Sequence, residues 1–482
     1  MPTTAESLSS RPHVKAIPYV DPLSAFAQFV DDETAVFLDS AQTVERLGRY
    51  SFIAAEPFQV LESRDGQVTI DGRPRAGSPF AVLRQELAKY PLRSEWGVPP
   101  FQGGVAGYFG YDLGRHLERL PAPRDDSTAF PDLRLGFFDV VAAFDNLERR
   151  AWILSNGYPE PEPRGRWQRA ETRMLAFWRR LVKAQEPLDG LPPAPRRTPF
   201  VRGNFTRADY ESAVQRIVDY IHAGDIFQAN LSQRLSARLP TDFTPFTLYR
   251  RLRALNPAPF AAYLKFGHQA IASSSPERFL KLTAGKVESR PIKGTRPRGR
   301  GERDDARLAE ELLASEKDRA ENVMIVDLLR NDLSRVCLDS SVEVPELCAL
   351  ERYATVHHLV STIVGQLRPE ATAVDLLEAS FPGGSITGAP KIRAMEIIAE
   401  LEPTRRGPYC GSIGYIGFDG TMDSNIVIRT YTINRDRVTF QAGGGIVADS
   451  DPAAEYEETL AKARALLVAL SPEARFDGLG RR

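Results

Sequence analysis

A lysine in a short basic stretch is the first residue of this sequence that could do covalent chemistry. Residues 289–299 contain two prolines and two glycines, so they predict a loop with a partly fixed path rather than a helix or a central strand. Lys293 lies in this loop beside three arginines, Arg290, Arg296 and Arg298. Neighbouring cations disfavour the charged form of an amine, and the neutral form is the nucleophile. Lys293 is therefore a candidate nucleophile, although a solvated basic turn or a nucleic-acid contact would have the same composition.

A carboxylate precedes Lys293 at a spacing that suits a hairpin. Residues 273–277 predict a turn between two strands, and Glu277 ends that turn. Because Glu277 lies 16 residues before Lys293, a strand-turn-strand hairpin could bring the two side chains into one site. The alternative is an exposed turn carboxylate.

Three further glutamates are candidate ligands of a hard cation such as Mg²⁺. Glu321 comes directly before the apolar middle of a long predicted helix, at the edge of a buried region. Glu455 and Glu458 are three residues apart, so a helix places them on one face, where they could share a metal with Glu321. Simple ion pairs of Glu321 with Lys317 and of Glu458 with Lys462 are the alternatives.

Two glycine-rich stretches suit anionic ligands. Residues 381–391 combine glycines, hydroxyls and a lysine before a predicted helix, but they lack the Walker spacing. We therefore reject nucleotide binding and keep anion binding at the helix N-terminus near Ala389. Gly443, Gly444 and Gly445 could bring bare backbone against a ligand carboxylate.

Hydrophobic periodicity predicts the elements that must position these residues. Strands are expected at 35–41, 50–55, 58–61, 67–72, 135–145, 151–155, 225–234, 260–266, 269–273, 278–282, 411–418, 424–433 and 437–442. Helices are expected at 80–90, 167–183, from Thr206 to Gly224, and at 305–335 and 453–470. Residues 1–14 predict a disordered lead. Stretches rich in proline, glycine and charge at 157–166 and 186–199 indicate a boundary between two halves.

Composition restricts the class of protein. The 482 residues include 62 Lys plus Arg and 63 Asp plus Glu, a net charge of 62 − 63 = −1, which argues against a general affinity for nucleic acid or anionic membranes. The three cysteines are too few and too scattered for a disulfide framework or a zinc site. No signal peptide and no membrane-spanning run is evident, so we expect a cytoplasmic protein.

Taken together, these motifs resemble the chorismate-utilising enzymes. The resemblance runs over 205–470 and rests on six stretches in order: 275–279 (SPERF), 291–297 (PIKGTRP), 317–322 (KDRAEN), 327–332 (DLLRND), 388–391 (GAPK) and 455–459 (EYEET). The first half resembles the amino-terminal domain of the large subunits of anthranilate synthase and aminodeoxychorismate synthase. This implies an α+β fold in which two large antiparallel sheets pack as a sandwich with helices outside. It also implies four segments: an amino-terminal domain at 15–156, a helical, proline-rich connection at 157–204, a catalytic domain at 205–470 and a tail at 471–482.

Lys293 resembles the aminodeoxychorismate synthase members, since anthranilate synthases typically have alanine there. Gln228 stands where isochorismate and salicylate synthases have a water-activating lysine, and a glutamine cannot act as that base. The resemblance implies that Lys293 attacks C2 of chorismate, that Glu277 protonates the departing C4 hydroxyl, and that ammonia then adds at C4. The product is 4-amino-4-deoxychorismate, a precursor of 4-aminobenzoate and folate. An anthranilate synthase, or a non-catalytic chorismate-binding relative, is the alternative.

The resemblance also implies a ligand set and partners. Mg²⁺ is expected on Glu321 and Glu458, with Glu455 as a further candidate. Substrate-binding residues are expected at Gly294, Thr295, His358, Thr387, Tyr409, Arg429, Gly443, Gly444, Gly445 and Lys462. No glutaminase signature surrounds any of the cysteines, so a separate glutamine amidotransferase subunit should supply the ammonia.

Residues 38–40 (LDS) resemble the tryptophan-contacting element of anthranilate synthases. An aspartate stands where those enzymes usually have glutamate, which argues against feedback inhibition by tryptophan. A structurally bound tryptophan is the alternative, with Ser40, Pro259, Phe260 and Ala261 as its contacts.

Overall fold

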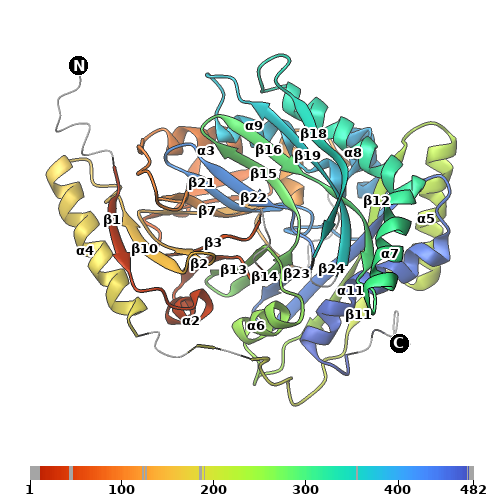
Figure 1. Ribbon diagram of the computed structural model, residues 1–482, viewed down its shortest axis with the longest axis horizontal. Coiled ribbons are helices and arrows are strands. Elements are labelled where there is room, and N and C mark those ends of the chain that lie inside the picture. The colour runs from red at the N-terminus through yellow and green to blue at the C-terminus, as the bar shows by residue number, and fades with distance from the viewer. Residues whose placement is uncertain are drawn as a thin grey trace.

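Two antiparallel sheets of twelve strands each form the centre of the molecule (Figure 1). The computed structural model describes residues 11–42, 47–121, 124, 128–183, 187–188, 190–353, 356–474 and 476. Residues 1–10 of the predicted disordered lead and residues 475 and 477–482 of the predicted tail lie outside the described residues.

The first sheet combines strands from both halves of the sequence. Its spatial order is β1 (His13–Ile17), β10 (Arg150–Ser155), β9 (Val140–Asp145), β3 (Tyr50–Ala55), β2 (Thr34–Asp39), β13 (Phe260–Phe266), β14 (Gln269–Ser275), β23 (Thr430–Asn434), β24 (Arg437–Ile446), β12 (Gln228–Arg238) and β11 (Arg202–Gly203), with β20 (Gly388–Ala389) paired to β12.

The second sheet also combines strands from both halves of the sequence. Its order is β17 (Ile292–Pro297), β19 (Val356–Gln366), β16 (Lys286–Arg290), β15 (Arg278–Thr283), β22 (Met422–Asn425), β21 (Ser412–Gly417), β7 (Gly104–Phe109), β8 (Leu133–Phe138), β4 (Gln59–Arg64), β5 (Gln67–Ile70) and β6 (Arg73–Arg75), with β18 (Glu343–Arg352) paired to β19. Neither sheet therefore belongs to one half of the chain.

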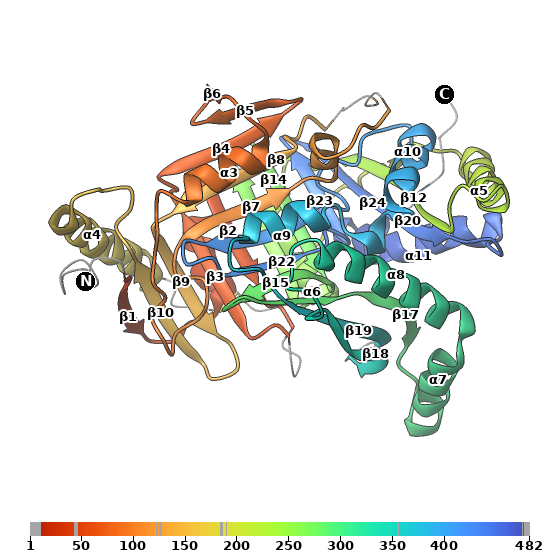
Figure 2. The ribbon, with the colours of Figure 1, turned by 90° about the horizontal axis from the view of Figure 1, so that it is seen from above.

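Helices cover the outer faces of both sheets (Figure 2). They are α2 (Pro22–Phe26), α3 (Pro79–Leu87), α4 (Pro163–Leu181), α5 (Arg207–His222), α6 (Pro245–Leu255), α7 (Glu302–Ala314), α8 (Glu316–Ser334), α9 (Ala373–Ser380), α10 (Lys391–Leu401) and α11 (Pro452–Leu470), with 3₁₀ turns η1 (Ala27–Phe29), η2 (Tyr111–His116) and η3 (Gly384–Ile386). Every helix in the described parts of the chain is too short or too polar to span a bilayer.

The core has layers because strand side chains alternate between two faces. Along β3, Phe52 and Ala54 join the cluster between the two sheets, whereas Ile53 and Ala55 join the cluster under α2, α4, α6 and α11. The helices α3, α8 and α9 cover the outer face of the second sheet. The predicted α+β sandwich with helices outside is confirmed.

Two predicted strands are wrong because the chain changes sheets within them. Residues 135–145 divide into β8 of the second sheet and β9 of the first. Between them the buried carboxylate of Asp139 lies against Arg169 and Arg173 of α4, at 3.2 and 3.3 Å. Residues 424–433 divide into β22 and β23 in the same way, with Arg429 (φ 52°) at the crossing.

The predicted loop at 289–299 is also wrong, since residues 289–290 end β16 and residues 292–297 form β17, and both strands pair with β19. Pro291 separates the two strands, and the proline and glycine content reflects this break and a bulge at Gly294 (φ 78°). The glycines 443–445, expected after a strand, lie inside β24.

The predicted helix at 305–335 is two helices, α7 and α8. Ser315 has an extended conformation (ψ 104°), and its side chain accepts a hydrogen bond from the backbone N–H of Asp318. This cap starts α8 in a new direction, and α7 projects from the rest of the molecule (Figure 2).

The start of the chain differs from expectation as well. His13 and Val14, placed in the disordered lead, begin β1, which pairs with β10. The cap of α5 is as predicted, since Thr206 accepts from the backbone N–H of Asp209.

Candidate active site

The Lys293 amine lies inside the protein. Its side chain is 11% exposed, and Nζ donates to Glu321 Oε1 at 2.7 Å and to the Ser385 carbonyl at 3.2 Å. The bulge at Gly294 shifts the register between Lys293 and Thr295, so the strand leaves its regular alternation at the lysine. The elements that surround it, α8, β12, β17 and β24, lie on one side of the molecule (Figures 1 and 2).

The expected crowding of Lys293 by free cations is wrong. Each neighbouring arginine has carboxylate partners: Arg290 pairs with Glu346 and Glu351, Arg296 with Glu311 and Asp318, and Arg298 with Asp305. The charged group in contact with the Lys293 amine is the carboxylate of Glu321.

Glu277 lies in the same site, as the hairpin spacing predicted. Arg278 pairs with Arg290 across β15 and β16, so Glu277 faces the start of β17 and its carboxylate accepts from the Ile292 N–H. Burial raises the pKa of Glu277 to about 7, against the opposing effects of Ser385 and Lys293. A carboxyl group with this pKa holds a proton near neutral pH and can donate it.

Glu321 joins the lysine to the first sheet. Its Oε1 accepts from Lys293 Nζ and from Gln228 Nε2, both at 2.7 Å. Burial raises the pKa of Glu321, but the charge and hydrogen bond of Lys293 outweigh it, and the net shift is downward. Glu321 is therefore an ionised carboxylate that connects α8, β17 and β12.

Glu455 and Glu458 of α11 approach β24 at Gly444. A Cβ added to Gly444 would lie 3.0 Å from Glu455 Oε2 and 3.2 Å from Glu458 Oε1. Glu455 Oε1 accepts from the Ser450 hydroxyl at 2.7 Å, whereas its Oε2 is buried and finds no hydrogen-bond partner among the described residues. Burial raises the pKa of Glu455, and the neighbouring charge of Glu458 raises it further.

The three glutamates have the carboxylate oxygens that a hard cation prefers, and the Oε2 of Glu455 is a buried acceptor without a donor among the described residues. Glu455 and Glu458 approach Gly444, whereas Glu321 approaches Gly445, and successive residues of a strand face opposite sides of the sheet. Within the described residues, no group of three or more acidic, His or Cys side chains is arranged to hold a metal ion. Glu321 forms an ion pair with Lys293 at 2.7 Å, and Glu458 forms one with Lys462 at 2.6 Å.

The glycines of β24 allow these close approaches. A side chain at Gly445 would collide with Gln228 Nε2 and lie 2.8 Å from Glu321 Oε1. Lys462 donates to the Gly443 carbonyl at 2.9 Å as well as pairing with Glu458, so its amine is engaged by α11 and β24.

Arg429 supplies a cation to the site. Its charge acts on both Glu277 and His358, and its guanidinium has no hydrogen bond or ion pair with any residue that the structure describes. Burial lowers the pKa of Arg429, and Glu277 opposes that shift. A half-buried guanidinium without a carboxylate partner is suited to an anionic ligand.

His358 is neutral near pH 7, because burial and the charge of Arg429 lower its pKa to about 4. Its Nδ1 lies 2.8 Å from the Thr295 hydroxyl, opposite it in the β17–β19 pair.

Three expected ligand contacts are engaged elsewhere in the fold. The Thr387 hydroxyl donates to the Gly383 carbonyl at 3.0 Å, within its own loop. Tyr409 is buried beside Arg406, whose guanidinium carbon is 6.0 Å from the ring centre. Lys391, near the proposed anion-binding helix start, pairs with Asp332 at 2.6 Å.

Two residues of the site, Ser385 and Ser450, were not predicted from the sequence, and no contact was predicted for Gln228. Ser385 contacts Lys293 through its carbonyl and Glu277 through its side chain, and Ser450 holds Glu455. A hydroxyl between two glycines and a helix was the available signal for Ser385. The contacts of Gln228 depend on a pairing of distant strands that no local pattern reveals.

The proposed tryptophan contacts lie together at one end of β2 and β13. The Ser40 hydroxyl donates to the Tyr50 carbonyl at 2.6 Å and lies 3.4 Å from the Pro259 carbonyl, and Ala261 pairs with Asp39. The Phe260 ring carries Arg278 over its face at 5.1 Å. Asp39 Oδ2 accepts from the Tyr249 hydroxyl at 2.7 Å and from Arg253 Nε at 2.6 Å, whereas Oδ1 accepts from the Ser51 hydroxyl at 3.4 Å.

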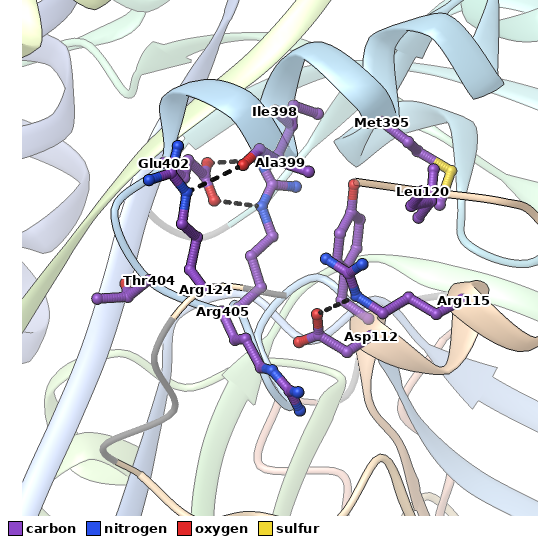
Figure 3. Close-up of a pocket in the computed structure, with 12 residues that line it drawn as sticks. Asp112, Arg115, Leu120, Arg124, Met395, Ile398, Ala399, Glu402, Thr404 and Arg405 are labelled. Carbon is purple, nitrogen blue, oxygen red and sulfur yellow. Dashed lines mark hydrogen bonds and ion pairs between the residues drawn. The ribbon is translucent and has the colours of Figure 1, made fainter. Parts of the chain in front are cut away.

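A small cavity of about 20 Å³ lies behind the site (Figure 3). One wall is the buried pair of Arg406 and Glu402, whose closest atoms are 2.7 Å apart. Arg406 also donates to the Ile386 and Asn230 carbonyls, so this pair separates the cavity from the loop that contacts Lys293.

Comparison with known proteins agrees with this geometry. The sequence profile of a family described as chorismate binding enzyme matches residues 33–468. Anthranilate synthase component 1 of Thermus thermophilus is 44% identical over 93% of this chain and 95% of its own length. Aminodeoxychorismate synthase component 1 of Klebsiella aerogenes is 42% identical over the same shares, 93% and 95%. The crystal structure of anthranilate synthase component I from Streptococcus pneumoniae superposes with a TM-score of 0.77 at 32% identity, covering 88% of this chain and 93% of that one.

Proposed function

Since the chain belongs to the chorismate binding enzyme family, in the group that contains anthranilate synthase component 1 and aminodeoxychorismate synthase component 1, we propose that it is an aminodeoxychorismate synthase component I. It converts chorismate and ammonia to 4-amino-4-deoxychorismate for the synthesis of 4-aminobenzoate and folate. The observation that carries this proposal is the buried Lys293 amine, next to the protonatable Glu277 and the ionised Glu321.

The first half of the reaction uses Lys293 and Glu277. Lys293 Nζ attacks C2 as the neutral amine, the two ring double bonds shift toward C4, and the C4–O bond breaks. Glu277 donates its proton to the departing oxygen, which leaves as water. A pKa of about 7 supports this role, because the group is substantially protonated at neutral pH.

In the second half, ammonia forms a bond to C4 and the double bonds shift back. The C2–Nζ bond breaks, its electron pair returns to Lys293, and the proton lost by the new C4 ammonium group restores the lysine ammonium. Glu277 regains its proton from solvent, which had received the ammonium proton of Lys293 before the attack on C2. The enolpyruvyl group is retained throughout.

Chorismate is a dianion, and its carboxylates need cations and backbone donors. Arg429 and the backbone of residues 443–445 bind one carboxylate end of chorismate. His358, Thr295 and Gly294 lie close to its ring. Glu321 and Glu458, with Glu455, would hold Mg²⁺. The bound ion would neutralise a substrate carboxylate.

A separate glutamine amidotransferase subunit supplies the ammonia. A glutaminase of the cysteine type needs a thiolate, and burial raises the pKa of Cys337 to about 11 and that of Cys410 to about 12. Burial also raises the pKa of Cys348, the third cysteine.

The second candidate is an anthranilate synthase component I, which the 44% identity to the Thermus thermophilus protein favours. Incubation with chorismate, Mg²⁺ and ammonium separates the two. We expect aminodeoxychorismate by mass spectrometry and no fluorescent product. Anthranilate fluorescence without any added lyase would contradict our choice.

A structurally bound tryptophan at Ser40 and residues 259–261 remains a secondary proposal. Arg253 and Tyr249 both donate to Asp39 Oδ2, and Oδ1 has only the 3.4 Å hydrogen bond from Ser51, so Oδ1 could accept from an amino group. Mass spectrometry of the purified protein after denaturation would detect a retained tryptophan.

A further inference from the structure

Lys391, the last residue of the glycine-rich stretch 381–391, forms hydrogen bonds to two different helices. Its Nζ donates to Asp332 Oδ2 at 2.6 Å and to the Ser380 carbonyl at 3.0 Å, and its side chain is 14% exposed. Ser380 is the last residue of α9, and Lys391 is the first residue of α10. The amine therefore joins the two ends of the loop 381–390, and Asp332 of α8 fixes the point where they meet.

The loop 381–390 contacts both proposed reacting groups through one residue. Residues 381–389 are all buried. Ser385 accepts from Lys293 Nζ through its carbonyl at 3.2 Å and contacts Glu277 through its side chain. A displacement of this loop would thus change the position of the nucleophile and of the acid together.

One face of α8 supports both the loop and the site. Glu321, Leu328 and Asp332 are seven and four residues apart, a spacing that puts them on one side of a helix. At one end of this row, Glu321 accepts from the amine of the proposed nucleophile, and at the other end Asp332 accepts from the lysine of the loop. Between them, a Cβ added to Gly384 would lie 2.5 Å from Leu328 Cδ2, so the loop lies directly on the helix.

The loop is anchored on both sides of Ser385. After Ser385, the Thr387 carbonyl accepts from the Asn230 N–H of the first sheet at 2.7 Å. Before Ser385, the amine of Lys391 holds the Ser380 carbonyl. The position of Ser385 therefore depends on two anchors, and the ion pair supplies one of them.

We propose that Lys391, paired with Asp332, is a positioning residue that acts through Ser385 to hold Lys293 and Glu277 in place for the attack and the proton transfer. This role rests on the proposed function and adds to it a residue that touches neither the substrate nor the reacting atoms. A buried ion pair by itself is weak evidence for stability, because the cost of removing two charges from water offsets their attraction. Placement matters more, because reacting atoms must be held about 3–3.5 Å apart and aligned.

The double variant Asp332→Asn/Lys391→Met removes this ion pair without leaving an unpaired buried charge. Its matched control is Asp32→Asn/Arg180→Met. That pair is similarly close, at 2.7 Å, but it lies on α4, at the opposite end of the molecule from α8 (Figures 1 and 2). Lys391→Arg, which keeps the charge but changes the reach of the side chain, is the substitute should the double variant fail to fold.

The measurement is the pH dependence of kcat and KM in the full-length chain with chorismate, Mg²⁺ and ammonium. We expect kcat for aminodeoxychorismate to fall about tenfold or more in the double variant, with the KM for chorismate within about threefold of wild type. The alkaline limb of kcat should move to higher pH, because the displaced Ser385 side chain no longer favours the ionised form of Glu277. Lys293 and Arg429, the charged groups that also act on Glu277, are unchanged in this variant, and the control should alter neither kcat nor the limb.

Ser385→Ala tests whether Lys391 acts through Ser385. This variant should move the alkaline limb in the same direction. Combined with the double variant, it should move the limb no further, because residues that act through one contact have effects that do not add.

Each other outcome decides against a defined claim. A folded double variant with unchanged kcat and an unchanged limb would reduce the ion pair to a structural contact, whatever its thermal midpoint. Limb movements that add in the combined variant would overturn the route through Ser385. A wild-type protein that makes no aminodeoxychorismate would overturn the proposed function; if it made anthranilate, the same comparison on that product would still decide the role of Lys391.

Discussion

At the scale of single residues, the site separates a proton donor from an ionised carboxylate by environment. Glu277 and Glu321 are both close to Lys293, yet burial raises the pKa of Glu277 to about 7 while the hydrogen-bonded Lys293 holds that of Glu321 below its usual value. Two carboxyl groups beside one amine thus take different protonation states, as an acid-assisted covalent reaction requires.

The pH dependence of the rate should report Glu277. The proton is present below its pKa of about 7 and is lost above it. We therefore expect kcat to fall on the alkaline side, by about tenfold per pH unit once the group is ionised. Stopped assays of aminodeoxychorismate from pH 6 to 9 would show this limb. Glu277→Gln should lower kcat by about 10²–10⁴-fold and remove the limb; a limb that persists in this variant would assign it to another group.

Arg429 should act on binding. Its side chain is half-buried, and its guanidinium has no ionic partner among the described residues. Arg429→Met should raise the KM for chorismate by at least about tenfold, since a charge-assisted pair is lost. Arg296→Met is the control. Arg296 lies on β17 near Lys293 but is ion-paired with Glu311 and Asp318, so its loss should change the KM for chorismate little. Equal effects of the two would argue against direct substrate contact.

At the scale of elements, the site depends on how closely α8 and α11 approach β24. Glycine at 444 and 445 is the condition for that approach, since Cβ atoms there would press on Glu455, Glu458 and Glu321. Loops contribute less. Ser385 comes from the 3₁₀ turn η3, whereas the charged groups of the site stand on strands and helices or directly beside them.

Gly445→Ala tests this condition. The added Cβ would collide with Gln228 and approach Glu321 to 2.8 Å, so we expect loss of most of the activity and a lower thermal midpoint. Gly66→Ala is the control, because its Cβ would meet nothing within 4 Å and only its φ of 82° is unfavourable. Full activity in Gly445→Ala would show that the site tolerates displacement of Gln228 and Glu321.

The break between α7 and α8 gives a second test of an element. Ser315 caps α8, which carries Glu321. Ser315→Ala should lower the free energy of unfolding in urea by about 1 kcal/mol, and Ser315→Asp, which keeps a capping oxygen, should restore most of it. If Ala and Asp behaved alike, the cap would not be what starts the helix.

At the scale of the whole molecule, both sheets contain strands from both sequence halves. β2 pairs with β13 in one sheet and β7 with β21 in the other, so neither half can complete a sheet alone. We expect differential scanning calorimetry to show one main transition. Two well-separated transitions would contradict this interlocked arrangement.

The limits of prediction from sequence follow the same division of scale. Local patterns were sufficient for β13, whose predicted and observed bounds agree, and for the Thr206 cap. The placement of Glu277 and Lys293 in one site was predictable because a hairpin joins near neighbours in sequence. The crossings at Asp139 and Arg429 were not, since a strand that changes sheets keeps the same apolar pattern. The carboxylate partners of the basic residues around Lys293 lie on α7, α8 and β18, and no local pattern reveals how these elements pack against β16 and β17, so the charges near Lys293 were misjudged.

The covalent role of Lys293 is the centre of the proposed function, and trapping tests it most directly. The protein would be incubated with chorismate and Mg²⁺ without ammonium, quenched, and measured by intact mass and peptide mapping, with Lys293→Ala alongside. We predict an adduct with the mass of chorismate less water, located on Lys293 and absent from the variant. A wild-type protein that turns over chorismate with ammonium yet never carries this adduct, or a Lys293→Ala variant as active as wild type, would contradict it.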